Sequence, residues 1–262
     1  MVRILLSGLA MAWLTLMVLA PVVIVLVEAL SAGVGAWWQA VSDEETRTSV
    51  ALSLKVAAIV VPCNAVFGVA AAWALARFRF RGRTLLLALL DLPLSVSPVV
   101  SGLVFVLLFG AQGWFGPWLQ AHNIQIIFAV PGIVLATAFV TLPMVARELL
   151  PLLESQGDDA ELAARTLGAS GWQVFWLVSF PRMRGALAYG VLLCMARALG
   201  EFGAVSVVSG HIRGQTDTLP LHVEILHNEY HFQAAFAAAS LLLLVGVATL
   251  LLRRLHTSES GH

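Results

Sequence analysis

Six long apolar runs alternate with polar segments along this chain of 262 residues. A bilayer core about 30 Å thick requires roughly 20 apolar residues in a helix. Every run reaches that length, and none shows the alternating pattern of barrel strands. The pattern predicts an all-α membrane protein with six transmembrane helices, which span residues 9–30, 50–76, 84–110, 127–150, 185–209 and 232–252.

The first run follows Arg3, as the core of a cleaved signal sequence would. Its apolar residues continue from Ile4 to Val27, however, whereas a signal-peptide core comprises only about 7–15 residues. We therefore expect a retained first helix.

Arginine placement predicts the orientation of the helices, because the cytoplasmic loops of membrane proteins are enriched in basic residues. Arginines cluster between the second and third runs, between the fourth and fifth, and after the sixth, whereas the alternate loops (31–49, 111–126 and 210–231) hold only Arg47 and Arg213. The clustered arginines are Arg77, Arg79, Arg81, Arg83, Arg147, Arg165, Arg182, Arg184, Arg253 and Arg254. Both termini are predicted to be cytoplasmic and the alternate loops periplasmic.

Composition excludes a water-soluble globular protein. Hydrophobic residues make up 60% of the chain and charged residues 11%, where soluble domains contain roughly 45–50% and 25%. The 15 basic and 15 acidic side chains balance, so nothing indicates nucleic-acid binding. Cys63 and Cys194 lie in apolar runs, without the spacing of a metal site or of a disulfide framework.

Residues 151–184 form the one long segment on the predicted cytoplasmic side. Asp158 is a good helix N-cap, and Glu161 three residues later completes a variant of the capping box. Gly168 is well placed to end this short helix in a left-handed conformation. The segment is therefore predicted to be structured.

Two alanines, Ala163 and Ala164, give this helix a slim face that can enter a groove on a partner protein. Ser170 can cap a second short helix, which carries three aromatic residues and is expected to stop before Pro181. The aromatic helix would anchor the segment to the membrane domain.

Arg197 and Glu201 lie four residues apart in the fifth predicted helix and share one face. Charge inside a bilayer is costly and typically marks a functional site. Two interpretations stay open: the pair belongs to an anion pathway or gate, or it only locks the fifth helix to a neighbour. Asp91 in the third helix is either a partner of Arg197 or a residue near the cytoplasmic interface.

Hydroxyl groups form a second candidate set. Prolines interrupt the third helix beside Ser97 and Ser101, where hydroxyls and freed backbone N–H groups could hydrogen-bond a passing anion. Serines in a membrane helix also permit close packing without any other role. Ser206 and Ser209, which follow Glu201 in the sequence, complete the candidate pathway.

The chain lacks the motifs of an enzyme. It has no HExxH pair, no G-x-S-x-G elbow and no phosphate-binding GxxxxGK[ST] loop. His227 and His231 are four residues apart, which suits a surface metal site, but a polar periplasmic helix is the simpler interpretation. We expect no catalytic residue, no metal site and no cofactor in this chain.

Several of these residues carry a family resemblance. Glu161, Ala163, Ala164 and Gly168, with Pro181 13 positions further on, resemble the EAA loop of ABC importer permeases. In that family this loop is the coupling helix, which docks into a cytoplasmic ATPase subunit. The resemblance implies an ATPase-coupling role for Asp158, Glu161, Ala163, Ala164, Gly168 and Pro181.

A second stretch narrows the resemblance. Residues 196–210 resemble the oxyanion branch of these permeases, which covers sulfate/thiosulfate and molybdate/tungstate. Residues 200–210, 212–214 and 97–102 are similar to the sulfate/thiosulfate (CysW-type) permeases. The resemblance implies a type I, MetI-like permease that moves sulfate or thiosulfate by alternating access.

The same resemblance implies the partners and the division of the chain. The partners are two copies of a CysA-like ATPase, which bind ATP and Mg, a second homologous permease of CysT/CysU type and a periplasmic sulfate-binding protein. Membrane lipid surrounds the permease itself. Residues 1–48 would form the first helix and a periplasmic loop, 49–253 the permease core and 254–262 a cytoplasmic tail. A molybdate or tungstate permease, or a self-sufficient secondary anion carrier, is the alternative.

Overall fold

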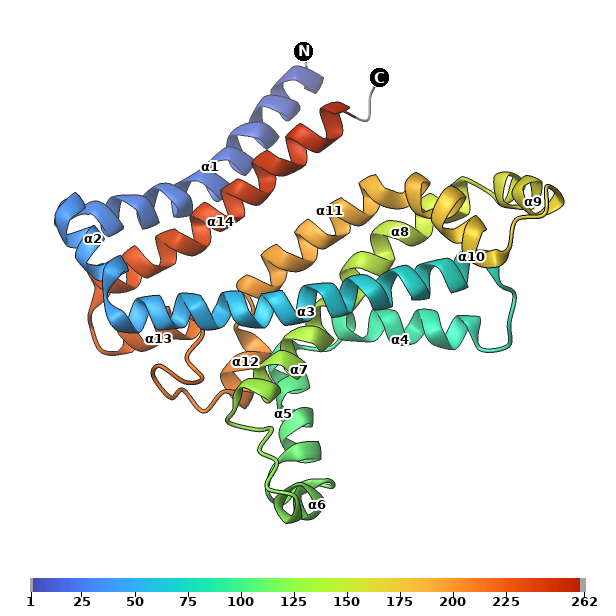
Figure 1. Ribbon diagram of the computed structural model, residues 1–262. Coiled ribbons are helices and arrows are strands. Elements are labelled where there is room, and N and C mark those ends of the chain that lie inside the picture. Colours follow the sequence, from blue (N-terminus) through green and yellow to red (C-terminus); the bar gives the residue numbers. More distant parts are fainter. Residues whose placement is uncertain (1, 260–262) are drawn as a thin grey trace.

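Helices make up all the regular structure of the described chain. The computed structural model describes the backbone of residues 2–259 and the side chains of residues 6–249, and no strand occurs among these residues. The helices (Figure 1) are α1 (Val2–Leu30), α2 (Val34–Ser42), α3 (Glu44–Arg77), α4 (Arg83–Ser95), α5 (Pro98–Phe109), α6 (Gly116–Ala121), α7 (Val130–Thr141), α8 (Pro143–Ser155), α9 (Asp159–Thr166), α10 (Gly171–Val174), the π-helix η1 (Phe175–Ser179), α11 (Phe180–Leu199), α12 (Gly203–Val208), α13 (Leu219–Asn228) and α14 (Phe232–Glu259).

The centre of the molecule is a bundle in which α3, α8 and α11 pack against one another. Their shared apolar cluster contains Val61 of α3, Leu149 of α8 and Cys194 of α11, all buried. A second cluster joins α3, α7 and α12 around Val60 and Ile133. Because α3 is 34 residues long and unbroken, it contributes to both clusters.

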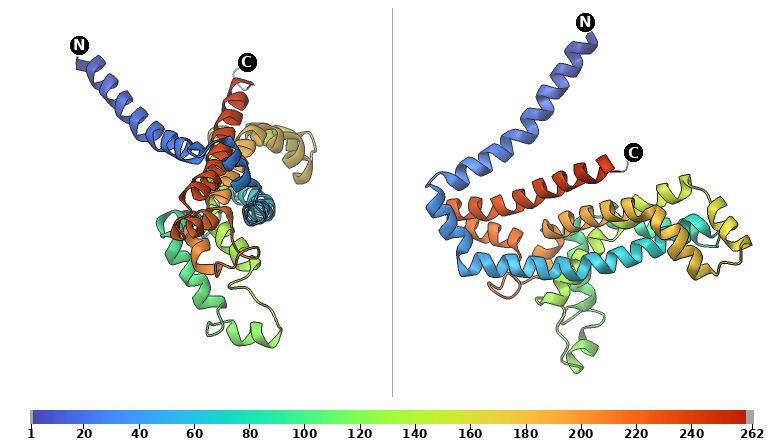
Figure 2. Two further views of the ribbon diagram at one scale, coloured as in Figure 1. Left: turned by 90° about the vertical axis from the view of Figure 1, so that its left-hand side faces the viewer. Right: turned by 45° about the horizontal axis from the view of Figure 1, so that its top comes forward.

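The two ends of the bundle carry different elements. α9 and α10 lie at one end, α2 and α13 lie at the other, and α5 with α6 projects to the side (Figure 1). α1 and α14 pack on each other and lead away from the bundle, with the two chain ends on the same side of the molecule (Figures 1 and 2).

The helices agree with the predicted spans in part. Four are long and apolar enough to cross a membrane: Leu6–Leu30, Glu44–Arg77, Val130–Ser155 and Phe232–Thr249. A fifth span is obtained if α4 and α5 are counted together. An all-α membrane protein is therefore confirmed, and each of these helices overlaps a predicted span.

Two predicted spans have the wrong shape. The run 84–110 is not one straight helix, because it breaks after Ser95 and turns by 109° into α5. The run 185–209 is divided after Leu199 into α11 and the short α12. Pro98 begins α5 and Gly203 begins α12, so residues poor at continuing a helix stand at both breaks.

The last helix extends beyond its predicted limit. α14 continues through residue 259, so residues 254–259 of the predicted tail are helical. Residues 260–262 lie outside the described residues, as do the side chains of Arg253 and Arg254, which contributed to the predicted orientation.

Candidate coupling segment and anion pathway

α9 ends as the sequence predicts but begins differently. Gly168 has a φ of +88°. The Ala169 N–H donates to the Ala164 carbonyl and the Gly168 N–H to that of Arg165, which is the Schellman arrangement. At the other end, the Asp158 side chain makes no capping hydrogen bond. The predicted capping box between Asp158 and Glu161 is therefore wrong.

Glu161 is turned inward instead, and this explains the missing box. The residue is 4% exposed, and its carboxylate lies 2.9 Å from Nε of Arg77 and accepts a hydrogen bond of 2.8 Å from the Ser179 hydroxyl. Arg77 also donates to the carbonyl of Leu153 at 2.8 Å. One buried ion pair thus ties α9 to the end of α3, to α8 and to η1.

The opposite face of α9 is open to solvent. Ala163 is exposed and Ala164 is half-buried, while Leu162 is 51% and Leu167 89% exposed. Apolar side chains this exposed at the tip of a short helix form a surface that a partner protein can cover. The slim face predicted from the alanine pair is therefore present and accessible.

The second short helix begins as predicted and ends differently. Ser170 accepts from the N–H of Gln173, whose side chain accepts from the N–H of Ser170, forming a capping box. The helix does not stop before Pro181, which lies in the first turn of α11. The π-helix η1 intervenes between α10 and α11, and Pro181, which has no N–H to donate, follows it.

The two helix breaks meet in space, because α5 packs on α12. A Cβ atom on Gly102 would lie 2.7 Å from the Ala204 carbonyl oxygen, and one on Gly203 would lie 3.0 Å from Cβ of Pro98. The two helices therefore approach closely, and a side chain at Gly102 would collide with the backbone of α12. The first turns of α5 and α12, whose leading N–H groups lack intrahelical partners, lie next to each other.

Arg197 and Glu201 form an ion pair across the second break. Nη2 of Arg197 lies 2.8 Å from Oε2 of Glu201, whose side chain is fully buried, while that of Arg197 is 37% exposed. Oε1 of Glu201 accepts a hydrogen bond of 3.0 Å from the N–H of Ala204 in the first turn of α12. Glu201 therefore stabilises the start of α12, and Arg197 neutralises it while presenting part of its guanidinium to the surroundings.

The predicted serines are divided between the two breaks, and most of their hydroxyls are engaged within the protein. Ser101 donates to the carbonyl of Ser97 and Ser206 to that of Gly203. Ser209 accepts from the N–H of His211 at the far end of α12. Ser97 stands at the start of α5 with an exposed side chain. Ser97 and Arg197 are thus the predicted polar side chains that remain accessible.

Asp91 is not a partner of Arg197. Its carboxylate lies 3.5 Å from Nε of Arg147, and both side chains are more than half exposed. These exposures fit the alternative prediction, in which Asp91 lies near the cytoplasmic interface of the membrane.

A buried polar network at the α2 and α13 end was missed by sequence reasoning. His222 lies 3.0 Å from Asp217 through Nδ1 and 3.2 Å from the Thr46 hydroxyl through Nε2, and Ser49 donates to Asp217 at 3.1 Å. All four residues are at most 2% exposed. The network fastens α13 to the start of α3, and His222 is therefore not part of a polar periplasmic surface.

An exposed cluster at the same end joins Arg213 to Glu45 and Glu229. Hydrogen bonding to Glu229 raises the pKa of the Arg213 guanidinium above its ordinary value. His227 and His231 are exposed nearby in the sequence. Within the described part of the chain, no three His, Cys, Asp or Glu side chains lie close enough to hold a metal ion.

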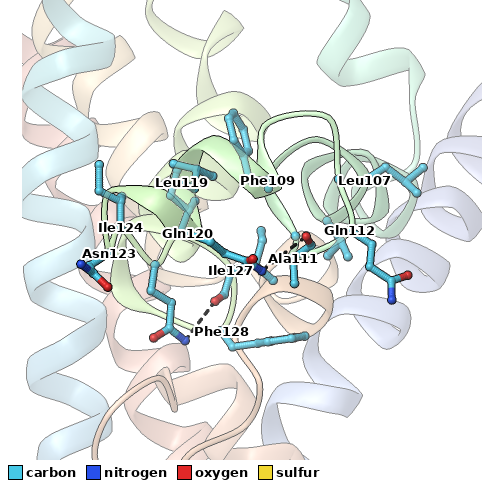
Figure 3. A pocket seen from close by; sticks show the side chains of 16 residues that line it. Leu107, Phe109, Ala111, Gln112, Leu119, Gln120, Asn123, Ile124, Ile127 and Phe128 are labelled. Carbon is cyan, nitrogen blue, oxygen red and sulfur yellow. Dashed lines mark hydrogen bonds between the residues drawn. The ribbon is translucent and has the colours of Figure 1, made fainter.

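A cavity of about 860 Å³ lies where the chain passes from α5 through α6 to α7. Gln112, Gln120 and Asn123 line it together with apolar side chains such as Phe128 (Figure 3). None of its lining residues is charged, and it contains none of the predicted site residues. It offers no positive side chain for an anion.

The apolar spans and the bent helix pairs define the class, an all-helical membrane protein. Residues 64–258 match the family described as "Binding-protein-dependent transport system inner membrane component". The "Sulfate transport system permease protein CysW" of Synechocystis sp. is 52% identical over 261 residues, covering 100% of this chain and 95% of that protein. The protein of the same name in Escherichia coli (strain K12) is 49% identical, covering 95% and 85%.

A further relative and two solved structures are also similar to this chain. The "Sulfate transport system permease protein CysT" of Escherichia coli (strain K12) is 36% identical, covering 93% of this chain and 90% of that one. A chain of a bacterial ABC transporter involved in the import of alginate matches with a TM-score of 0.80 at 13% identity, covering 98% of this chain and 96% of that chain. The same type of transporter in complex with its alginate-bound periplasmic protein matches with a TM-score of 0.79 at 13% identity, covering 96% and 92%.

The chain therefore belongs to the family of binding-protein-dependent transport system inner membrane components, as a permease of the CysW type. It is a membrane permease subunit of an ABC importer and not itself an enzyme. The MetI-like fold expected from the EAA-like motif is confirmed at the level of the fold.

Proposed function

We propose that this chain is one of two permease subunits in an ATP-driven importer of sulfate or thiosulfate. The observation that carries this proposal is the 52% identity, over the whole chain, to a permease named for sulfate transport. The 36% identity to CysT supports a second, homologous permease as the partner. A periplasmic sulfate-binding protein would deliver the anion.

The proposed topology has six crossings with both termini in the cytoplasm. The crossings are α1, α3, α4 with α5, α7 with α8, α11 with α12, and α14. Arg77, Arg83 and Arg165 lie at the end of the bundle that carries α9, whereas Trp37 and Trp38 lie at the other end in α2. The positive-inside tendency supports a cytoplasmic α9.

α9 is proposed to dock into the ATPase, which would bind ATP and Mg. Its exposed side chains, Leu162 and Leu167 among them, would enter a groove on that subunit. The buried pair of Glu161 with Arg77 would pass the resulting movement to α3 and α8. Asp158, Ala163, Ala164, Gly168 and Pro181 would shape the segment.

The anion is proposed to pass the point where the two helix breaks meet. Sulfate is a dianion, so its desolvation must be offset by hydrogen-bond donors and positive charge. The start of α5, the exposed Ser97 and the partly exposed guanidinium of Arg197 supply both. Glu201, Ser101, Ser206 and Ser209 would hold this geometry.

Uptake of labelled sulfate into proteoliposomes that contain the complete transporter, with ATP enclosed and binding protein outside, tests the proposal. We expect uptake to require ATP and to be reduced by thiosulfate far more than by molybdate or tungstate. Uptake without ATP would indicate a secondary carrier. Stronger competition by molybdate would indicate the related molybdate/tungstate function.

A further inference from the structure

An apolar groove of about 620 Å³ lies between α3 and the helices that follow α9. One wall is formed by α3 from Ala65 to Trp73, and the other by Trp172, Trp176 and Leu187, together with their neighbours in α10, η1 and α11. Every residue lining the groove is apolar. The groove therefore runs along a predicted membrane-spanning helix and suits a hydrocarbon chain.

Aromatic side chains gather at the α9 end of this groove. Trp73 packs edge-on against Phe175 with ring centroids 5.4 Å apart, and against Phe78 at the same separation. Trp172 and Trp176 are 71% and 43% exposed. Tryptophans concentrate at the level of lipid headgroups, which places this end of the groove at the membrane interface and the Ala65 end in the hydrocarbon region.

Positive charge gathers at the same end. Arg184 lies four residues after Phe180 and three before Leu187, so it shares a helical face with two residues that line the groove. The Cα–Cβ bonds of a helix tilt towards its N-terminus, which in α11 is the interface end. Arg79 and Arg81 lie in the loop that follows Phe78, and all three arginines are exposed. Within the described residues none of the three forms an ion pair.

We propose that this groove binds an anionic phospholipid, with an acyl chain between α3 and η1 and the headgroup phosphate on Arg184. A long arginine side chain that extends from a helix face to the interface is suited to this role. Basic residues close to an anionic leaflet attract its lipids. The site goes beyond the proposed function and does not depend on which anion is transported.

The test uses phosphatidylglycerol and phosphatidylcholine, each with a photoreactive diazirine in one acyl chain, and the complete transporter in vesicles. After illumination, adducts are counted on the tryptic peptide 166–182, which contains four of the aromatic groove residues. We expect about fivefold more adduct from phosphatidylglycerol than from phosphatidylcholine, the factor that corresponds to one arginine at an anionic leaflet. Arg184→Gln should abolish this preference while leaving adduct formation by phosphatidylcholine unchanged.

Two matched variants separate occupancy of the groove from general contact with the bilayer. Ala70 lines the groove and is exposed, so Ala70→Phe fills it without disturbing the core and should lower adduct yield severalfold. Ala58 is exposed on the same helix but outside the groove, so Ala58→Phe should leave the yield unchanged. Equal labelling by the two lipids in the unaltered chain, or equal losses in both variants, would overturn the proposal. So would the absence of adducts because another subunit covers the groove.

Discussion

Removing the carboxylate of Glu161 should release α9 from the rest of the permease. Glu161 and Arg77 have side-chain exposures of only 6% and 8%, and they lie 2.9 Å apart. Glu161→Ala leaves the Arg77 guanidinium buried with the Leu153 carbonyl as its remaining partner. Breaking one side of a buried ion pair costs about 3–5 kcal/mol, whereas loss of a helix cap alone would cost about 0.5–2 kcal/mol.

Hydrogen exchange of the α9 amides measures this cost, because local opening determines how fast they exchange. Since about 1.4 kcal/mol corresponds to a factor of ten, exchange should accelerate on the order of a hundredfold or more, and ATP-dependent uptake should be lost. The matched control is Glu154→Ala. Its pair with Arg83 has a similar distance of 2.8 Å but exposures of 42% and 47%, so the loss should be at most about 1 kcal/mol.

Removing both partners of the pair should be less harmful than the two single changes suggest. Arg77→Ala together with Glu161→Ala leaves no buried charge unpaired, so the double variant should lose less than the sum of the two single variants. Equal exchange rates in Glu161→Ala and Glu154→Ala would refute the idea that the buried pair holds α9.

Three further variants test the remaining elements. Gly168→Val should weaken ATPase association and abolish uptake because the backbone φ is +88°; no atom lies near an added Cβ, so the cost comes from the backbone conformation alone. Gly168→Asn should keep both functions, since asparagine tolerates that conformation. Equal binding of the two variants in a pull-down with the ATPase would argue against the conformational reason. Arg197→Ala should abolish sulfate uptake while the complex still assembles. If the arginine lines the anion pathway, adding Glu201→Ala should not restore uptake. Recovered transport of the double variant at equal expression would show that the ion pair only holds the helix in place. Gly102→Val should separate α5 from α12 and reduce uptake more than tenfold, since its Cβ would lie 2.7 Å from the Ala204 carbonyl oxygen. Gly185→Ala is the control, and it should transport normally because the space around Gly185 is open.

Local features of the coupling segment could be predicted from the sequence because their causes lie within a few residues. The positive φ of Gly168 and the cap at Ser170 depend only on their immediate neighbours. The role of Glu161 could not be predicted in the same way, because its partner Arg77 is 84 positions earlier in the chain. The local signal for a capping box did not prevail, because the Glu161 carboxylate pairs with Arg77 in the interior.

The helix breaks show the same limit. Prolines predicted that a helix weakens near Ser97, but the 109° turn between α4 and α5 depends on how α5 packs on α12. That contact joins Gly102 to Ala204, about a hundred positions apart. The network of Thr46 with His222 likewise spans 176 positions, so no spacing rule could reveal it.

The length of α3 has a mechanical consequence. At about 1.5 Å per residue, its 34 residues extend roughly 50 Å, well beyond a bilayer core of about 30 Å. One end is clamped to α9 through Arg77 and the other to α13 through Thr46 and Ser49. A rigid rod of that length tilted by about 10° displaces its far end by about 9 Å, several atomic diameters. If the ATPase docks on α9 as proposed, α3 would act as a lever, converting a small rotation at that end into a displacement large enough to open or close the opposite face to an anion.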